Sequence, residues 1–287
     1  MRDYKENSRY NDDFYIQFSG LQRLESSSNT GSYIGSTSDW TISWDDILDN
    51  SSSNGVSSLD QSSHSIYNNL PSSGGNGISV LHRIITVVDS DLLITLRASG
   101  VDKVIFINNI KKRTTVTTIS MNSLVYTSSD NTCKFYVNGE LHTTISNFAN
   151  GDFASSEPAS IGSDSIGSTN RGRVGSLRNI VFSSKAFSYV ELAYLYDTGT
   201  IPTSAYSSIE HYYPLNEIPI ISGQYIVFKD KATLFNTSAA SEDLTAIGWT
   251  LLELGLSGEG FQSATAYKSA NTNETYNFSG LTFDGLG

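Results

Sequence analysis

The chain has 287 residues, with 18 Lys and Arg against 29 Asp and Glu, and a formal net charge of −11. Such an excess of negative charge repels the phosphates of nucleic acid, so we exclude nucleic acid as a partner. The hydrophobic content of 38% and the aromatic content of 11% suffice for a packed core, which excludes a wholly disordered chain.

The cysteine, histidine and hydropathy patterns exclude further classes. A single cysteine, Cys133, rules out an internal disulfide framework and a multi-cysteine zinc site. The four histidines, at positions 64, 82, 142 and 211, lack the spacing of metal ligands. No apolar stretch is long enough to span a bilayer. The first residues, MRDYKEN, contain no apolar segment, so we expect no Sec signal peptide.

The first strong strand pattern lies between residues 35 and 49. Trp40, Ile42 and Trp44 alternate with Thr41 and Ser43, which is the period-two pattern of a half-buried strand. A weaker strand is expected at residues 13–18. The two tryptophans could be core residues or a platform on which sugar rings stack. We favour the core, because Ile42 shares their face.

A long stretch rich in Ser, Asn and Gly runs from Asp49 to Gly77. We predict a surface loop with at most one short strand, near Ile66. Long surface loops often carry binding residues, so this rim loop is the favoured ligand-binding segment. Disorder is the alternative interpretation.

Short strands joined by short links follow. We expect strands at residues 78–88, 92–97, 104–110 and 114–120, each antiparallel to the next. Residues 124–127 are expected to pair with residues 133–137. Asn138 and Gly139 then give the strongest signal of a type I′ turn in the chain, so residues 140–145 should return as the partner strand.

One helix is predicted, beginning at Ser188. Ser188 and Glu191 have the spacing of a capping box, and Gly199 stands where a helix ends in the left-handed conformation. Apolar residues at 192, 195 and 196 form one stripe. Beyond residue 203 the composition changes, and strands alternate with polar stretches. We therefore assign residues 1–203 to a sandwich and residues 204–287 to a small β-rich unit or an extended arm.

Several segments together resemble the concanavalin A-like, laminin G-like jelly-roll family. They are residues 40–44 (WTISW), 134–139 (KFYVNG), 160–162 (SIG), 174–182 (VGSLRNIVF) and 187–196 (FSYVELAYLY). The resemblance covers residues 13–200 and implies an all-β, two-sheet antiparallel sandwich with one short helix. It also implies rim loops that bind glycans or protein partners, sometimes with calcium.

A further segment is similar to one found after such domains in phage and surface proteins. Residues 212–217 (YYPLNE), followed by Lys229 and Asp230, match the first part of that pattern. The Gly-Asn-His part of the pattern is absent, and residues 231–235 (KATLF) stand in its place.

The sequence lacks common signatures of catalysis and offers few candidate metal ligands. The sequence has no Glu-x-Asp-x-x-Glu pattern of the related glucanases and no Gly-x-Ser-x-Gly elbow, so we expect no enzyme activity. Calcium is a conceivable cofactor, with Asp45, Asp46 and Asp49 as the first candidate ligands and Asp164 as the second. Solvated or turn-capping aspartates are the alternative, which we favour.

The sequence therefore predicts a non-catalytic binding or adhesion module that recognises glycans. It would belong to a virion, as a fibre, decoration or tail protein, or to a cell surface, and would form a homo-oligomer or part of a larger assembly. A purely structural virion protein without sugar affinity is the alternative, and a glycoside hydrolase or lyase is the third reading.

Overall fold

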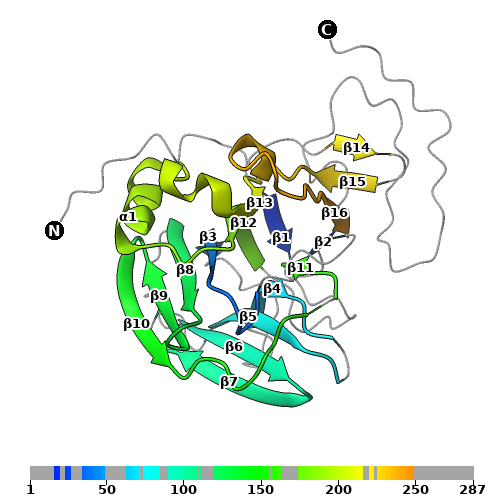
Figure 1. Cartoon of the computed structure of the whole chain (residues 1–287). Coiled ribbons are helices and arrows are strands. Elements are labelled where there is room, and N and C mark those ends of the chain that lie inside the picture. The colour runs from blue at the N-terminus through cyan, green and yellow to red at the C-terminus, as the bar shows by residue number, and fades with distance from the viewer. Residues whose placement is uncertain are drawn as a thin grey trace, which may run out of the picture.

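The computed structural model consists of two antiparallel β-sheets packed face to face (Figure 1). It describes residues 16–19, 23–26, 34–48, 63–71, 74–84, 90–108, 110, 119–155, 157–162, 174–215, 220–222 and 225–247. Every strand pair within these residues is antiparallel, as the sequence predicts.

The first sheet has seven strands. Its order is β1 (Ile16–Ser19), β12 (Val174–Ser183), β3 (Trp40–Leu48), β8 (Ile119–Thr127), β9 (Thr132–Val137) and β10 (Glu140–Ser146). A seventh strand, β13 (Ile209–Tyr213), pairs with the C-terminal half of β12, beyond the residues that pair with β1. We call this sheet A.

The second sheet, sheet B, has nine strands. Its order is β14 (Ile220–Ser222), β15 (Tyr225–Phe228), β16 (Leu244–Ile247), β2 (Arg23–Ser26), β11 (Ser160–Ile161), β4 (Ser63–Asn68), β5 (Gly77–Ile84), β6 (Ser90–Ala98) and β7 (Val101–Ile107). Strands β10 and β7 are the ends of their sheets on one flank. His142 of β10 lies 3.2 Å from the carbonyl oxygen of Asn108, so the two edges meet there.

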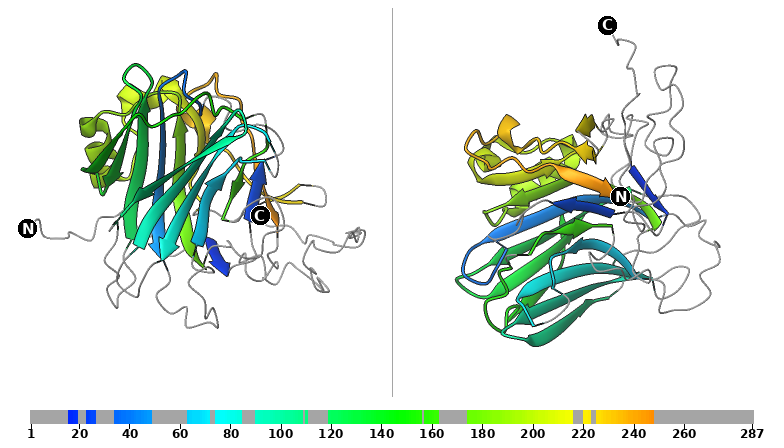
Figure 2. Two further views of the ribbon diagram at one scale, coloured as in Figure 1. Left: turned by 90° about the horizontal axis from the view of Figure 1, so that it is seen from below. Right: turned by 90° about the vertical axis from the view of Figure 1, so that its right-hand side faces the viewer.

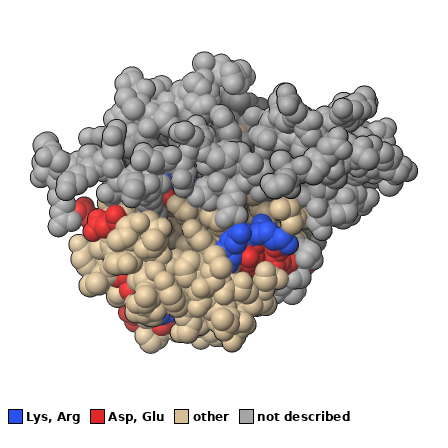
Figure 3. Space-filling model, turned by 90° about the horizontal axis from the view of Figure 1, so that it is seen from above, with Lys and Arg blue, Asp and Glu red and all other residues tan. Residues whose placement is uncertain are grey.

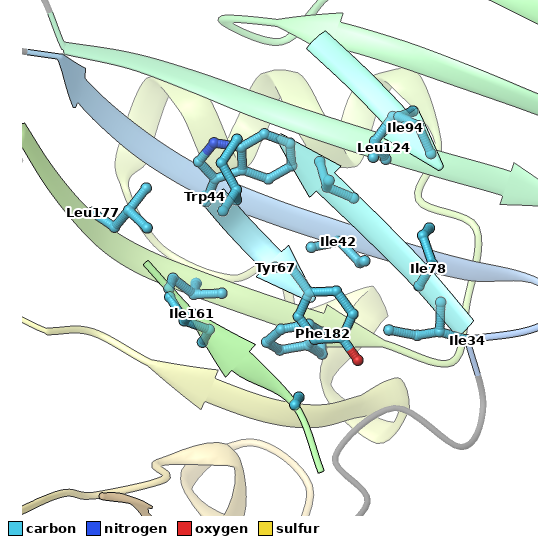
Figure 4. Packing of buried hydrophobic residues seen from close by; sticks show 14 of the residues in the cluster. Ile34, Ile42, Trp44, Tyr67, Ile78, Ile94, Leu124, Ile161, Leu177 and Phe182 are labelled. Atoms are coloured by element: carbon cyan, nitrogen blue, oxygen red, sulfur yellow. The ribbon is translucent and has the colours of Figure 1, made fainter. Parts of the chain in front are cut away.

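The main core lies between the sheets (Figure 4). Trp40, Ile42 and Trp44 of β3 are each at most 1% exposed and pack in this core. Tyr67 of β4 faces Phe182 of β12 across it, with ring centroids 5.3 Å apart. The tryptophans are therefore core residues, as the period-two pattern predicts, and form no sugar-stacking platform.

The hairpin of β9 and β10 has the predicted turn. Asn138 and Gly139 have φ of 53° and 76°, the left-handed values that a type I′ turn requires at both positions. Gly139 also lies against the helix α1 (Tyr189–Thr198), where an added Cβ would come within 3.1 Å of the Cα of Ala193. Glycine thus serves both the turn and the packing of the helix.

The helix α1 (Tyr189–Thr198) begins and ends where the sequence predicts. Ser188 and Glu191 form both hydrogen bonds of the capping box, and Gly199 ends the helix with φ of 69°. Leu192 and Leu195 pack on the outer face of sheet A in a second apolar cluster. The 3-10 helices η3 (Thr203–Ser208) and η4 (Ala232–Leu234) contribute to the same cluster.

The segment beyond residue 203 adds strands to both sheets. Strand β13 pairs with β12 of sheet A, and β16 pairs with β2 of sheet B. Up to residue 247, the described part of the segment that is predicted as a small β-rich unit or an extended arm therefore adds strands to both sheets. The predicted tail at 257–287 lies outside the described residues.

Strand β8 differs from its prediction. The sequence pattern suggested separate strands at 114–120 and 124–127, whereas β8 runs without a break from Ile119 to Thr127. Residues 114–118, like the expected first-strand residues 13–15, lie outside the described part. Within the part that is described, no helix is long and apolar enough to cross a membrane.

Candidate functional site

Five connections lie together at one end of the sandwich (Figure 2). They precede β3, join β4 to β5, β6 to β7 and β8 to β9, and link β10 to β11. Their described residues are 34–39, 69–71, 74–76, 99–100, 128–131, 147–155 and 157–159. We call this surface the aspartate rim. The connections at the opposite end of these strands lie largely outside the described residues.

A buried aromatic cluster supports the rim. Trp40 stacks on Tyr126 with ring centroids 5.4 Å apart, and Phe148 and Phe153 contact both rings. All four side chains are at most 1% exposed. The Trp40 Nε1–H donates to the carbonyl oxygen of Gly35 at 2.9 Å. Because interior side chains pack at crystal-like density, the rim connections are held in one arrangement.

Asn131 joins two of these connections. Its side-chain oxygen accepts hydrogen bonds from the N–H of Ala149 at 2.8 Å and from the hydroxyl of Tyr126 at 3.2 Å. Its amide nitrogen donates to the carbonyl oxygen of Ala149 at 3.0 Å, and its own carbonyl oxygen accepts from the N–H of Phe148 at 2.9 Å. The β8–β9 turn and the β10–β11 connection are thereby fixed to each other.

Two rim carboxylates are each anchored through one oxygen. Asp39 Oδ1 accepts hydrogen bonds from the backbone N–H and from the hydroxyl of Ser128, both at 2.8 Å. Asp152 Oδ1 accepts from the N–H of Ser36 at 3.3 Å and from that of Ala154 at 3.1 Å. Asp39 therefore joins the segment before β3 to the β8–β9 turn. Asp152 joins the β10–β11 connection to the segment before β3 and also holds its own connection in place.

Asp130 completes the set. Its Oδ1 accepts a hydrogen bond from the hydroxyl of Thr132 at 2.9 Å. Asp130 and Asp152 are exposed, and Asp39 is half-buried. In all three residues the second oxygen, Oδ2, has no hydrogen bond to the described part of the chain. The rim thus presents three oriented acceptors, because an ionised carboxylate accepts and never donates.

The electrostatic character of the rim is acidic. Burial raises the pKa of the Tyr126 phenol, and nearby Cys133 and the carboxylates of Asp39, Asp130 and Asp152 raise it further. In the full sequence, the connecting segments 27–39, 69–76, 99–100, 128–131 and 147–159 contain four acidic residues and no Lys, Arg or His.

The two cations on strands next to the rim are already engaged. The Lys103 Nζ donates to the carbonyl oxygen of Asn147. Arg97 binds both carboxylate oxygens of Asp102, at 2.5 and 3.1 Å, and donates to the carbonyl oxygen of Pro71 at 2.9 Å. Neither cation neutralises a rim aspartate in the structure.

The aspartates proposed as calcium ligands do not converge. Asp46 points between the sheets, where its Oδ2 lies 2.8 Å from Nδ1 of His82 on β5. Asp45, its neighbour on β3, points to the opposite face and accepts a hydrogen bond from Asn179 Nδ2 at 2.7 Å, with Arg178 Nε at 3.5 Å. Successive strand residues face opposite sides, so these two cannot share an ion.

The other proposed ligands, Asp49 and Asp164, lie outside the described residues. Among those that are described, no group of three His, Cys, Asp or Glu side chains is placed to hold a metal ion. The favoured binding loop from Asp49 to Gly77 is also not one surface. Strand β4 crosses the sandwich within it, and its Ile66 and Tyr67 are core residues. Residues 69–71 and 74–76 lie at the aspartate rim, and residues 49–62 lie outside the described residues.

A second buried Asp–His pair lies in the C-terminal segment. Asp230 Oδ2 is 2.7 Å from Nδ1 of His211, and the Asp230 carboxylate also accepts from the backbone N–H groups of Tyr212, Ala232 and Glu242 at 2.9–3.1 Å. This carboxylate joins β13, η4 and the residues before β16. It is a structural centre of the C-terminal segment.

Sequence reasoning missed the three rim aspartates. Asp39 lies within the stretch 35–49 that the sequence predicts as a strand, whereas Asp130 and Asp152 lie in two connections between strands, 22 residues apart in the sequence. The signal that could have found them is the direction of the strands. In an antiparallel sandwich, every second connection lies at the same end, and the five connections of the aspartate rim carry acidic residues without a base.

Comparisons with known proteins show the fold. No family profile and no curated protein matches the sequence. Among solved structures, a candidate carbohydrate-binding protein from Bacteroides ovatus ATCC 8483 is similar, with a TM-score of 0.51 and 17% identity over 83% of this chain and 59% of that protein. The enzymatically active domain of tailspike protein 2 of bacteriophage CBA120 has a TM-score of 0.52 and 11% identity, over 70% of this chain and 30% of that domain.

These similarities confirm the predicted concanavalin A-like jelly-roll sandwich with two antiparallel sheets and one short helix. Solved structures with a similar fold thus include a candidate carbohydrate-binding protein and a phage tailspike domain. The chain spans about three fifths of the Bacteroides protein and less than a third of the tailspike domain. The fold therefore defines an architecture, and the function has to be argued from the site.

Proposed function

We propose that this chain is a non-catalytic module that binds glycans, carried on a virion as a fibre, decoration or tail protein, or on a cell surface. The observation that supports this most is the aspartate rim. Its acceptor oxygens are exposed or half-exposed, oriented by their own hydrogen bonds, and supported by a buried aromatic cluster. A site that is already ordered loses little entropy on binding.

The chemistry of the rim suits hydroxyl-rich ligands. A sugar presents many hydroxyl groups, each of which donates one hydrogen bond, and a hydrogen bond to a charged acceptor is stronger than one to a neutral acceptor. The rim connections also present exposed hydroxyls and amides, such as Thr37, Ser38, Asn147 and Asn150. These can donate to sugar oxygens. Donors and acceptors are thus placed side by side on one rigid surface.

The positions of the histidines favour binding over catalysis. His82 and His211 are buried and paired with Asp46 and Asp230 inside the sandwich. His142 is exposed on the β10 edge, where its ring contacts a backbone carbonyl. None of these three imidazoles lies among the residues of the aspartate rim. A general base has to reach the proton that it removes, which these residues cannot do for a ligand at the rim.

The structural comparisons support the same proposal at the level of analogy. One similar structure is described as a candidate carbohydrate-binding protein and the other as a phage tailspike domain. A glycan-binding role and a place on a virion are both found among proteins with this architecture. The low charge content, 16% of residues, agrees with the surface in Figure 3, where charged side chains are sparse among the described residues.

The test is a glycan array probed with the purified chain, repeated with a chelator. We expect binding to a restricted set of polysaccharides or oligosaccharides, reduced at least tenfold by Asp130→Lys together with Asp152→Lys. Glu140→Lys, which makes the same charge change as each of these two substitutions but on the exposed residue after the β9–β10 turn, is the matched control. Binding to none of the surface polysaccharides on a broad array would contradict the proposal.

A second candidate function is that of a structural assembly protein without sugar affinity. The observation that favours it is the outer face of α1, where Tyr189, Val190 and Tyr194 are 57%, 73% and 47% exposed. Exposed apolar side chains that gather on one face often mark protein contacts. A stable oligomer by light scattering that Val190→Glu dissociates, in a chain that binds no glycan, would support this alternative.

A further inference from the structure

The charge at the aspartate rim bears on the kind of glycan that could bind there. We infer that the rim selects glycans without acidic groups and rejects sulfated, uronic and sialylated ones. This inference rests on the proposed function, because it concerns the same surface. It goes beyond that function by naming the ligand class.

The first step of the argument is the sign of the charge. The negative charges of Asp39, Asp130 and Asp152 all raise the pKa of the Tyr126 hydroxyl, so the three carboxylates lie near one another. Glu157 adds a fourth acidic residue in the same connections, and these connections contain no basic residue. A carboxylate or sulfate brought to this rim would meet like charges on several sides, and like charges at an interface are costly.

The second step is the hydrogen-bonding capacity of the three carboxylates. Each uses Oδ1 to hold the rim together and leaves Oδ2 as an acceptor. An acceptor of this kind needs a ligand that brings a hydrogen, as a sugar hydroxyl does. A sulfate, or an ionised carboxylate, brings acceptors only. Acidic substituents therefore fail to bond here as well as being repelled.

The third step is that, among the described residues, both cations on the strands next to the rim are already bound, so neither reverses this preference. Arg97 is held by both oxygens of Asp102 and by the carbonyl oxygen of Pro71, and Lys103 donates to the carbonyl oxygen of Asn147. Binding an acidic sugar would require these contacts to break. Recognition of acidic groups normally uses a free arginine or lysine.

An observation independent of charge comes from the β4–β5 connection. Asn69 is 1% exposed, and its Nδ2 has no hydrogen-bond partner. Its side-chain oxygen accepts from the N–H of Ile78 at 2.8 Å, which fixes the orientation of the amide. Buried donors are nearly always satisfied by protein, water or ligand. Within the described residues the Asn69 Nδ2 therefore lacks an acceptor, which a ligand, a water molecule or the rest of the chain can supply.

The experiment compares matched pairs that differ only in acidic groups. Dextran and dextran sulfate form one pair, and asialo and sialylated N-acetyllactosamine glycans form another, on the same array or in solution titrations. We expect at least one neutral member to bind, and the acidic member of its pair to bind at least tenfold more weakly at low salt. Raising the salt should narrow that ratio, because salt screens the repulsion.

Variants sharpen the comparison. Asp130→Asn and Asp152→Asn keep the shape of the side chain and replace one carboxylate oxygen by an amide donor. Each should weaken the neutral ligand about tenfold. In the double variant Asp130→Lys/Asp152→Lys, the acidic member of the pair should bind as tightly as the neutral member or more tightly. Glu140→Lys should leave the ratio unchanged, and far-UV circular dichroism should show that all variants are folded.

The possible results separate this inference from the proposed function. If acidic members bind as well as or better than the neutral ones, the selectivity is overturned while glycan binding stands. If no member of any pair, and no other glycan, binds, both fail together. Neutral binding with rejection of the acidic members, reversed by the two lysines, would establish the inference.

Discussion

Replacing Glu191 by glutamine is expected to destabilise the sandwich in a way that depends on pH. The Glu191 carboxylate is 8% exposed and joins α1 to the segment that precedes it and to η3. Its Oε1 accepts from Lys185 Nζ and from Ser204 Oγ, each at 2.6 Å, and its Oε2 accepts from the N–H of Ser188 at 2.8 Å. Glutamine keeps the shape but removes the charge.

The magnitude follows from the pKa of this group. Burial alone would raise the pKa of Glu191, but the hydrogen bonds from Lys185, Ser204 and Ser188 outweigh it and lower the pKa to about 2, from an ordinary value of 4.5. This lowering corresponds to about 3 kcal/mol of folding free energy. Because the Lys185 side chain is 39% exposed, screening by solvent reduces the expected effect to about 2 kcal/mol.

The sign of the pH dependence is fixed by the direction of the pKa. The folded-state pKa lies below the unfolded one, so the contribution is fully present above about pH 4.5 and is lost as the pH falls toward 2. At pH 7 we expect Glu191→Gln to lower the melting temperature by about 4–8 °C. Near pH 2 the wild type and the variant should converge.

The assay is urea denaturation of both proteins at a series of pH values, followed by tryptophan fluorescence. Glu140→Gln is the control, because Glu140 is exposed, and it should change stability by less than about 0.5 kcal/mol. Equal stability of Glu191→Gln and wild type at pH 7 would refute the reasoning. So would a difference of the same size at pH 2 and pH 7.

Three further predictions concern other contacts. Gly139→Ala should cost about 1–3 kcal/mol in urea denaturation, because φ is 76° and the new methyl group would meet the Cα of Ala193 at 3.1 Å. Gly74→Ala is the control, because Gly74 is also at positive φ but faces open space, and it should cost about 1 kcal/mol. Equal costs of the two substitutions would contradict the packing argument. Asp230→Ala should cost about 3 kcal/mol or more in stability, because it leaves buried N–H groups without their acceptor. Hydrogen exchange should show that amide protection is lost first in β13–β16. A uniform loss of protection across the sandwich would argue against a local centre. Burial raises the pKa of the Cys133 thiol. The native protein at pH 8 should therefore not react with a thiol reagent that modifies Cys133 in denaturant. A fast reaction of the native protein would place this residue at the surface.

The sequence patterns that proved most informative are local ones. Ser188, Glu191 and Gly199 specify a helix by interactions within about one turn of each end, and Asn138 and Gly139 specify a turn by their own φ preferences. Such signals need no knowledge of the rest of the chain. The period-two alternation around Trp40 predicted a strand correctly for the same reason, because it too is a local pattern.

That alternation held more information than the metal prediction used. If Trp40 and Trp44 face the core, Asp46 must face it too, and Asp45 must face away. The structure shows this division, with Asp46 on His82 inside and Asp45 on Asn179 outside. The proposed calcium ligands were therefore separable from the sequence alone.

Other features depend on contacts between distant residues, which one sequence does not reveal. The pairing of β13 with β12 and of β16 with β2 joins the C-terminal segment to both sheets, although its composition suggested a separate unit. The aspartate rim likewise assembles Asp39, Asp130 and Asp152 from three connections. Its existence follows from the strand order, and no local pattern contains that order.

The most direct test of the central claim is to locate a bound glycan on the protein. Amide chemical shifts of isotope-labelled protein would be followed while a neutral oligosaccharide that binds on the array is added. We predict that the perturbed amides cluster in residues 34–39, 128–131 and 147–155, with those of α1 unchanged. Perturbations confined to α1, or to any surface away from the aspartate rim, would contradict the account.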